Sequence, residues 1–379
     1  MIAMLRQALN VEVIMQLKDF FDRALVEAVA RSFISAYPPF DQAGFVAQSV
    51  NGLDQLELIQ RGAHIATAMR AHLPTDYRSA IDIMLKALDF SAPTPSSMAT
   101  FRYLPHTIFV STYGLDDFTS SMHAHKALTQ RFTAEFSIRP FLIKYPEQTL
   151  ALLAEWAKEP NEHVRRLVSE GTRPRLPWGT RLPAFIADPA PVLALLEGLR
   201  DDLALYVQRS VANNLNDIAK DHPELIVTLC RRWMVDAPPS RQWIVRHALR
   251  VLVKRGNHGA LKVLGVGSRP KIDITDIDIP RRVRIGDKAQ IFFTLTSCSS
   301  KVQTLEVDFA VHFVKANGTT AAKIFKLRKL KLAGREIVRL SRTISFAPMT
   351  TRTPYPGCHV IEAQINGVKF PLGSLKLFE

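Results

Sequence analysis

The spacing of hydrophobic residues changes once along this chain. In the first part, apolar side chains recur every three or four positions, as they do at Leu17, Phe20, Phe21, Leu25 and Val29. From Pro270 onward, apolar and polar residues alternate. Steps of three and four predict amphipathic helices, whereas alternation predicts strands with one buried face. We therefore predict an α-helical domain over residues 1–265 and a β domain over residues 266–379, joined through the glycine-rich stretch Gly256–Gly267.

The helical part repeats itself loosely. Four helices are expected to begin after a polar break, at Ile138-Arg139, Val164-Arg165-Arg166, Val207-Gln208-Arg209 and Val245-Arg246-His247. Partner helices are expected between them, over Gln148–Ala157, Pro191–Arg200 and Pro223–Trp233. The spacing of roughly 26 to 43 residues overlaps that of HEAT repeats, which stack helix pairs into a curved solenoid. We therefore predict an all-α HEAT-like solenoid followed by an all-β domain.

Arginine recurs at equivalent positions of these repeats. If the second helix of each pair lines the concave face, five arginines lie along one surface: Arg139, Arg165, Arg166, Arg209 and Arg246. Such a basic track suits the phosphates of a nucleic acid. The alternative is an outward, solvated stripe. We favour the track because arginine recurs there without being mixed with lysine and glutamate.

The β part resembles an immunoglobulin-like sandwich in its pattern. About seven alternating segments occur in about 110 residues, and Asn317-Gly318 and Asn366-Gly367 are strong signals for hairpin turns. No tryptophan follows Trp243, so the Cys…Trp…Cys pattern of true immunoglobulin domains is absent and a Cys298–Cys358 disulfide is not expected. The basic run KLRKLKL either guards a strand edge or contacts DNA.

Charge points to a polyanionic partner. The 379 residues include 49 Lys and Arg against 35 Asp and Glu, a formal charge of +14. From Gly267 onward we count 19 Lys and Arg against 9 Asp and Glu, so 10 of the 14 surplus charges fall in the last domain. A concentrated surplus favours binding to nucleic acid, although solubility alone also explains basic proteins.

Several functional classes lack support in the sequence. No apolar run approaches the ~20 residues that span a bilayer, and Asn10, Glu12, Gln16 and Lys18 interrupt any signal-peptide core. Three cysteines fit a reducing compartment, so we expect a cytoplasmic protein. The sequence contains no phosphate-binding glycine loop, zinc-ligand spacing or nucleophile elbow. We expect no cofactor, no metal, no membrane contact and no obligate protein partner, and a monomeric state.

The stretch Asn161–Phe185 contains the first candidate for catalysis. A helix predicted to end at Gly171 places Glu170 at its last turn, where helix carbonyls disfavour a carboxylate. Prolines then forbid any helix before Phe185, in a connector that carries Arg173, Arg175, Arg181 and Trp178. A residue that breaks a local rule is a functional candidate, although a salt bridge to Arg173 or Arg175 explains Glu170 equally well.

Two further carboxylates accompany Glu170. The helix Val207–Lys220 buries Val211, Leu215 and Ile218, and an Asn-rich run that forms helix poorly carries Asp217. Glu135 lies at a helix junction, where its charge can face a groove.

The motifs around these residues resemble one family. The run SEGTRPRLPWGTRLP is similar to the signature of the AlkC branch of the AlkC/AlkD DNA alkylation-repair glycosylases. The segments YPPFD, LDQLELIQRGAHIATAM, LPTDYRSA, VHFVKANG and TRTPYPGCH also resemble the AlkC pattern, so the likeness extends over nearly the whole chain. A C-terminal immunoglobulin-like domain beside the HEAT-like domain is a feature of this branch.

The resemblance implies base excision from double-stranded DNA. The substrate would be a cationic alkylated base such as 3-methyladenine or 3-methylcytosine, and Glu135, Glu170 and Asp217 occupy the positions of the branch's active-site acids. Trp178 would pack against deoxyribose or a base, unless it only anchors the proline loop, and Arg173 and Arg175 would contact DNA. No lysine is placed for a Schiff base, so we expect no lyase activity. The alternatives are a non-catalytic HEAT scaffold that binds DNA and an RNA-binding repeat protein.

Overall fold

The computed structural model describes residues 16–88, 99–266, 269–349 and 352–379. Their packing divides the chain into two compact units, residues 1–218 and residues 219–379. Thr351, which opens the motif TRTPYPGCH, lies outside the described residues, as do Gly267 at the end of the glycine-rich stretch and Asn10 and Glu12 near the N-terminus. No helix in the described ranges is both long and apolar enough to cross a membrane.

The first unit is built from helices. They are η1 (Leu17–Phe20), α2 (Arg23–Ala36), α3 (Gln42–Val50), η2 (Leu53–Gln55), α4 (Leu58–His72), α5 (Tyr77–Lys86), η3 (Ala99–Tyr103), α6 (Leu104–Tyr113), α7 (Phe118–Leu128), α8 (Arg139–Lys144), α9 (Pro146–Trp156), α10 (Glu162–Gly171), α11 (Pro183–Ala187), α12 (Ala190–Leu199) and α13 (Leu205–Ile218). The elements labelled η are 3₁₀-helices.

Local sequence sets where these helices begin. Asp22, Asp41, Asp76 and Asp117 precede α2, α3, α5 and α7, and each carboxylate accepts a hydrogen bond from the backbone N–H three residues further on. Such a cap contributes about 1 kcal/mol by satisfying a helix donor that has no partner within the helix. Proline occupies the first turn of α8, α9, α11 and α12, where its missing N–H costs nothing.

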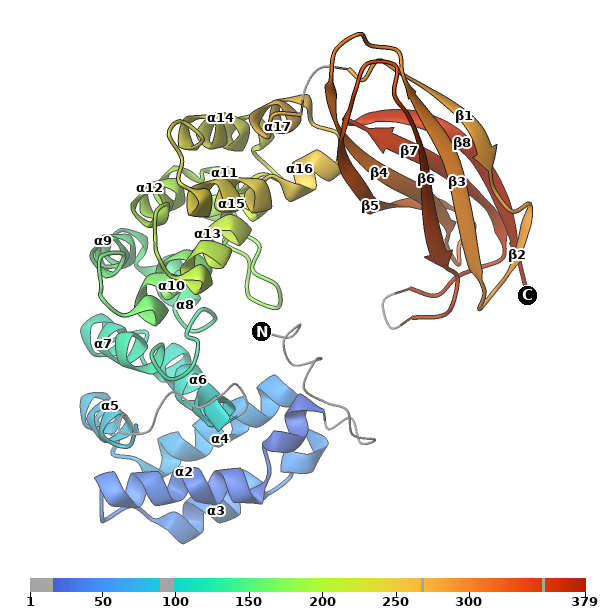
Figure 1. Ribbon diagram of the computed structural model, residues 1–379. Coiled ribbons are helices and arrows are strands. Elements are labelled where there is room, and N and C mark those ends of the chain that lie inside the picture. The colour runs from blue at the N-terminus through green and yellow to red at the C-terminus, as the bar shows by residue number, and fades with distance from the viewer. Residues whose placement is uncertain (1–15, 89–98, 267–268, 350–351) are drawn as a thin grey trace. The chain divides into compact units, whose positions relative to one another are not determined.

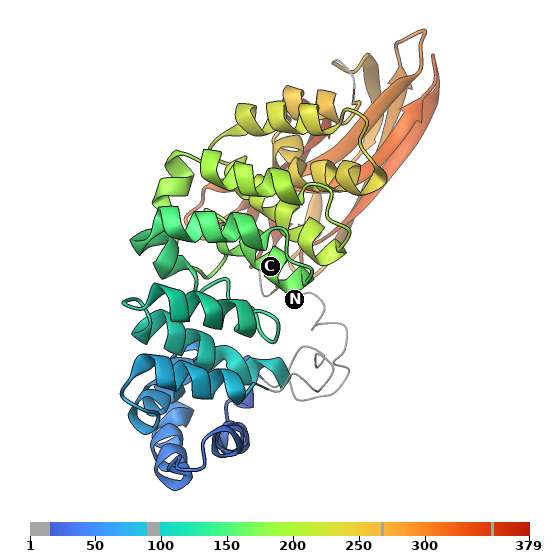
Figure 2. The ribbon, with the colours of Figure 1, turned by 90° about the vertical axis from the view of Figure 1, so that its left-hand side faces the viewer.

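The helices of this unit stack in two rows, as Figures 1 and 2 show. The pairs α5 with α7 and α9 with α12 pack along the outer row, and the pairs α4 with α6 and α10 with α13 pack along the inner row. Apolar side chains between the rows form the core, and they include Phe109, Phe141, Leu167, Leu196 and Val211. The predicted repeat of stacked helix pairs is confirmed. Arg139 begins α8, and Val164 and Val207 are the third residues of α10 and α13, whereas Val245 is the seventh residue of α15 (Pro239–Ala248), so that predicted start was wrong.

In the described part of the second unit, four helices accompany a sandwich. The helices are α14 (Pro223–Trp233), α15 (Pro239–Ala248), α16 (Arg250–Lys254) and α17 (His258–Val263). The strands are β1 (Ile272–Asp278), β2 (Arg282–Arg284), β3 (Lys288–Ser297), β4 (Gln303–Val314), β5 (Thr320–Leu332), β6 (Ile337–Ser345), β7 (Gly357–Ile365) and β8 (Val368–Phe378). The sheets have the orders β1-β3-β6 and β2-β8-β7-β4-β5, antiparallel except where β2 pairs with β8.

The fold class predicted from the sequence is confirmed, with two details changed. The described residues contain eight strands rather than about seven, because the three-residue β2 is too short to alternate visibly. The change from helix to strand falls between Val263 and Ile272, yet packing groups α14–α17 with the sandwich. The division into domains 1–265 and 266–379 therefore stays a prediction.

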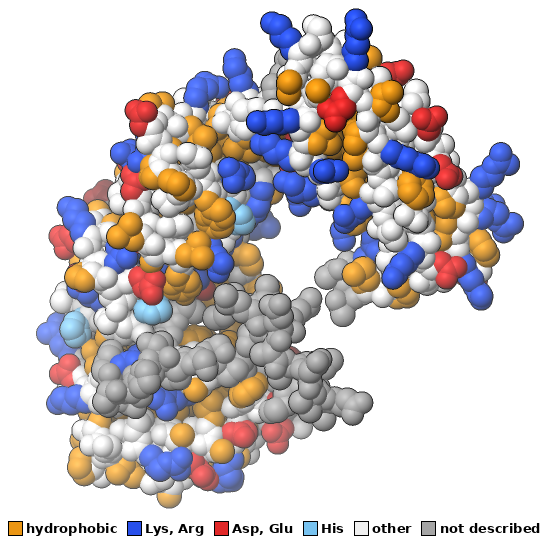
Figure 3. Space-filling model, in the orientation of Figure 1, with side chains coloured by type: hydrophobic (Ala, Val, Ile, Leu, Met, Phe, Trp, Pro, Cys, Tyr) orange, Lys and Arg blue, Asp and Glu red, His pale blue; other side chains and the backbone are white. Residues whose placement is uncertain are grey.

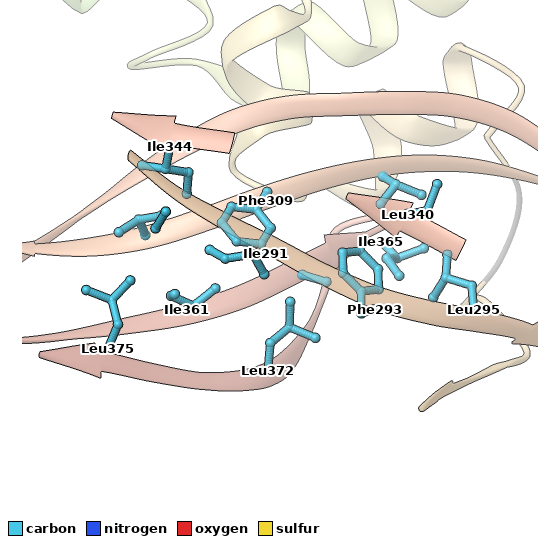
Figure 4. Close-up of a cluster of buried hydrophobic side chains, with 14 of the residues drawn as sticks. Ile291, Phe293, Leu295, Phe309, Leu340, Ile344, Ile361, Ile365, Leu372 and Leu375 are labelled. Carbon is cyan, nitrogen blue, oxygen red and sulfur yellow. The ribbon is translucent and has the colours of Figure 1, made fainter. Parts of the chain in front are cut away.

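The sandwich has an apolar core between its sheets, shown in Figure 4. Ile291, Phe293 and Leu295 point from β3 toward Phe309 and Ile361 on β4 and β7. These five side chains have no exposed surface, and they occur at every second position of their strands. Alternation in the sequence therefore follows from one face of each sheet being buried.

Two glycines join α16 to the sandwich. Gly256 follows α16 and Gly367 lies in the β7–β8 turn, and both have positive φ, at 75° and 79°. A Cβ built on Gly256 would lie 2.7 Å from the carbonyl oxygen of Gly367, so the two backbones meet without room for a side chain. Beside them, the Gln364 amide donates to the Lys254 carbonyl oxygen at 2.9 Å.

Replacing Gly256 by alanine is expected to destabilise this unit by about 2–3 kcal/mol, because the change adds a backbone collision to a strained φ. Gly318→Ala is the matched control: its φ is also 75°, but a Cβ added there would meet nothing within 4 Å. The control should lose about 1 kcal/mol. Urea unfolding measures both. Equal losses of stability in the two variants would mean that the close contact between Gly256 and Gly367 contributes nothing to stability.

Candidate active site

Two neighbouring helices present matching rows of polar side chains. On α10 and just beyond it, Arg166, Glu170 and Arg173 follow one another at steps of four and three residues. On α13, the row Tyr206, Ser210, Asn213 and Asp217 has steps of four, three and four. Such steps keep side chains on one face of a helix, and α10 packs beside α13.

The structure brings the three predicted carboxylates into one network. Arg166 Nη1 lies 2.5 Å from Glu135 Oε2, and Arg166 Nη2 lies 3.6 Å from Glu170 Oε1. Arg173 Nη1 contacts Glu170 Oε1 at 2.6 Å, and its Nη2 contacts Asp217 Oδ2 at 2.7 Å. We call these five residues the charge ladder, since acids and arginines alternate along it. Glu135 reaches it from the turn between α7 and α8.

The charge ladder is enclosed by protein. Glu135, Glu170 and Asp217 are 7%, 7% and 2% exposed, and Arg173 is 8% exposed. Ser210 Oγ donates to Glu170 Oε2 at 2.6 Å, and Arg166 also donates to the hydroxyl of Thr133. Buried charges need this degree of pairing, because removing one partner leaves another charge without compensation.

Burial and pairing shift the two glutamates in opposite directions. Burial raises the pKa of Glu135, because Arg166 compensates only part of the lost hydration. Burial also opposes ionisation of Glu170, but Arg166, Arg173 and the Ser210 hydroxyl outweigh it, so the pKa of Glu170 is lowered. Carboxylates whose pKa values separate in this way suit different roles in one site.

The charges in and around the charge ladder are balanced. Three carboxylates face two guanidiniums within it, and the buried Arg139 interacts with all three acids, in surroundings where charges are poorly screened. Tyr206 closes one end: the Arg166 Cζ lies 5.1 Å from the centre of its ring, and the residue is still 40% exposed. An aromatic ring therefore separates part of the ladder from solvent.

Trp178 stands at the tip of a tight turn outside this cluster. Its side chain is 81% exposed, and its φ is +66°, in the left-handed region that non-glycine residues avoid. The Gly179 N–H donates to the Leu176 carbonyl at 3.2 Å, and Pro177 precedes Trp178, an arrangement that fits a type II turn. Holding tryptophan where glycine is usual costs about 1–3 kcal/mol, and such strain concentrates at functional sites.

Most of the arginines predicted to form a phosphate track do not face solvent. Arg139 is 1% exposed, and Arg165 binds Asp202 and the carbonyls of Glu159 and Pro160. Arg166 belongs to the charge ladder. These three arginines do not form one exposed row, because equal repeat positions do not imply equal depth, and their contact with DNA stays a prediction.

The remaining predicted arginines lie nearer the surface. Arg209 is exposed on α13, and Arg246 is exposed on α15 of the second unit. Arg175 is half-buried in the connector after α10, whereas Arg173 lies inside the charge ladder.

Tyr206 and Ser210 were not identified from the sequence. Both precede Asp217 on the same face of α13, so the 4-3-4 spacing of polar residues along that helix was the available signal. No group of three or more His, Cys, Asp and Glu in the described part of the chain could hold a metal ion.

The chain resembles known proteins over nearly its full length. Residues 273–379 match the C-terminal Ig-like domain of the uncharacterised protein YhaZ. YhaZ from Bacillus subtilis (strain 168) is 35% identical over 353 residues, which cover 93% of this chain and 96% of YhaZ. A solved structure of Pseudomonas fluorescens alkylpurine DNA glycosylase AlkC, bound to DNA containing an abasic site analogue, aligns with a TM-score of 0.89 and 39% identity, over 96% of this chain and 100% of AlkC.

Replacing Arg173 by methionine is expected to destabilise the first unit by about 3–5 kcal/mol, because Glu170 and Asp217 then lose their shared cation. Asp217→Asn should cost less, because Arg173 keeps Glu170 as a partner. In the double variant, the free energy of unfolding should fall by less than the sum of the two single decreases, with a difference of at least about 1 kcal/mol. Urea unfolding at neutral pH measures all three variants. Additive losses would show that the two side chains do not interact energetically.

Proposed function

This chain belongs to the AlkC family, and on that premise we propose that it is a DNA glycosylase that removes alkylated bases from double-stranded DNA. The observation that carries the proposal is the charge ladder, in which Glu135, Glu170 and Asp217 gather around two arginines. The AlkC match, whose solved complex contains DNA with an abasic site analogue, supports DNA as the partner.

We infer that the substrates are cationic bases of the 3-methyladenine and 3-methylcytosine type. In the reaction, the bond between C1′ of deoxyribose and the base nitrogen breaks, and its electron pair leaves with the base. A water oxygen bonds to C1′ and gives up a proton, so the products are a free base and an abasic site. Because a cationic base departs neutral, the enzyme needs no strong general acid.

The protein then has to stabilise positive charge on the sugar. The transition state resembles an oxocarbenium ion, as it does in glycoside hydrolysis. The carboxylates of the charge ladder, placed beside this sugar, lower the barrier without moving during the reaction. Glu170, with its lowered pKa, stays ionised and serves this role together with Asp217.

Glu135 is the carboxylate best suited to accept the proton from water. Burial raises its pKa toward the range in which a carboxylate is an efficient base, while Arg166 keeps it oriented. The cations of the charge ladder are arginines, whose guanidinium groups do not form Schiff bases with sugar aldehydes. We therefore propose a monofunctional enzyme that leaves the abasic strand intact.

Exposed groups around the charge ladder supply the contacts to DNA. Trp178 presents a bare indole, which packs against deoxyribose or a base and favours nearby cationic character. Arg209 is exposed on α13 and is placed to neutralise a phosphate.

We propose that the sandwich also contacts DNA, through its edge strand β5. The thirteen residues of β5 include no Asp or Glu and five cations: Lys323, Lys326, Arg328, Lys329 and Lys331. Lys326 pairs with Glu306 at 2.6 Å, whereas the other four make no ion pair in the described part of the chain. Figure 3 shows many Lys and Arg side chains over the visible face of the sandwich. Lysines on an edge strand also prevent pairing with other chains, and this role is compatible with DNA binding.

Glu170→Gln and Asp217→Asn are expected to lower the rate of base release about 100-fold or more, because each removes a charge that stabilises the cationic transition state. The assay follows 3-methyladenine released from methylated duplex DNA under single-turnover conditions. Glu162→Gln, an exposed change on the same helix α10, is the control and should retain the wild-type rate. If wild type releases no base although it binds the duplex, the chain is a DNA-binding scaffold instead.

Removing four cations from β5 (Lys323, Arg328, Lys329 and Lys331, each to glutamine) is expected to weaken DNA binding. Each lost phosphate contact lowers the slope of log K against log salt by about 0.9. The control removes four exposed cations around the opposite edge strand β2: Arg281, Arg282, Arg284 and Lys376. Because both variants lose the same net charge, equal changes in slope would refute a specific contact at β5.

A further inference from the structure

A single buried arginine holds both ends of the loop that carries Trp178. Arg139 Nη1 donates to the carbonyl oxygens of Gly171 at 2.8 Å and Arg173 at 3.0 Å, and its Nε donates to the Thr180 carbonyl at 2.6 Å. Gly171 and Arg173 precede the turn, and Thr180 follows it. One guanidinium therefore fixes the start and the end of the loop together.

This arginine is charged and costly to bury. Burial, followed by repulsion from Arg173, lowers the pKa of Arg139 to about 10, so it still carries its charge at neutral pH. Its Nη2 has no hydrogen-bond partner in the described part of the chain. The Gly171 carbonyl ends α10, where the helix dipole favours a cation. The bonds to the loop thus compensate this buried charge together with the nearby carboxylates of Asp217, Glu135 and Glu170.

The residues just before Arg139 contact the same two features. Glu135 belongs to the charge ladder through Arg166. A Cβ built on Gly179 would lie 3.3 Å from Phe136, which therefore packs directly against the turn. A Cβ on Gly171 would lie 2.8 Å from Ile138, so that side chain abuts the end of α10. Residues 135–139 thus touch the acids on one side and the loop on the other.

We propose that Arg139 is a positioning residue that holds Trp178 at a fixed place relative to the charge ladder. The turn needs such a support, because the left-handed backbone of Trp178 is retained only where its surroundings enforce it. Arg139 acts through the loop and touches no substrate. The consequence for catalysis rests on the proposed glycosylase function, in which Trp178 packs against the damaged nucleotide while the acids face its sugar.

Hydrogen exchange tests the support in the free protein. Arg139→Gln is expected to speed exchange of the Gly179 and Leu182 amides, which bond to Leu176 and Pro174, by about tenfold or more. Arg165→Gln is the matched control, since Arg165 also donates to backbone carbonyls but not to those of the loop. Unchanged exchange of both loop amides in Arg139→Gln would overturn the proposal.

A double-mutant cycle tests the consequence for base release. Arg139→Gln and Trp178→Ala should each lower the single-turnover rate about tenfold at saturating enzyme, and the double variant should be no slower than Trp178→Ala alone. Losses that multiply would show that Arg139 acts independently of the loop. Arg139→Lys, which keeps a cation and a donor, should restore part of the loop protection and part of the rate.

The two experiments separate two kinds of failure. If wild type releases no base, the proposed function fails, but the exchange rates of the loop amides still decide whether Arg139 holds the loop. If Arg139→Gln does not fold, Arg139→Lys carries the same comparison. A lowered rate in Arg139→Lys with wild-type loop exchange, and a loss that multiplies with that of Trp178→Ala, would overturn the proposal.

Discussion

Alternating charge inside the protein is the constraint on which the site depends. Three carboxylates and two arginines stand in contact where little water reaches them, so each arginine is shared between two acids. Coulomb attraction is strong in such surroundings, but the lost hydration of five charges opposes it. The arrangement is stable only while every partner is present. Under the proposed function, charges held in this way act on a charge that develops during the reaction.

The helical repeat holds these charges in place. Glu135 comes from the turn before α8, Glu170 from α10 and Asp217 from α13, so three successive layers of the first unit contribute one acid each. The apolar faces of α10 and α13 are fully buried, which fixes the rows of polar side chains against each other. Arg139 extends the same support to the loop of Trp178 by binding carbonyls on both sides of the turn.

The sequence predicts the fold well, because the period of hydrophobic residues can be read without knowing which residues are in contact. It also identifies Glu170 and Asp217, since a carboxylate at a helix end and an Asn-rich helix each break a local rule. The spacing of residues along the sequence does not reveal how deeply each side chain is buried. Arg139 and Arg209 occupy similar repeat positions, yet one is enclosed and the other exposed. Tyr206 and Ser210 break no local rule, so only their spacing from Asp217 along α13 distinguishes them from ordinary surface residues.

The central claim is that the charge ladder stabilises a cationic sugar, and one binding measurement tests it directly. Duplex DNA with a pyrrolidine abasic analogue carries a positive charge where the transition state does, whereas the tetrahydrofuran analogue is neutral and similar in shape. Transition-state analogues bind more tightly than ground-state ligands, so wild type should bind the pyrrolidine duplex at least about tenfold more tightly. Equal affinities for the two duplexes would contradict this account of the site.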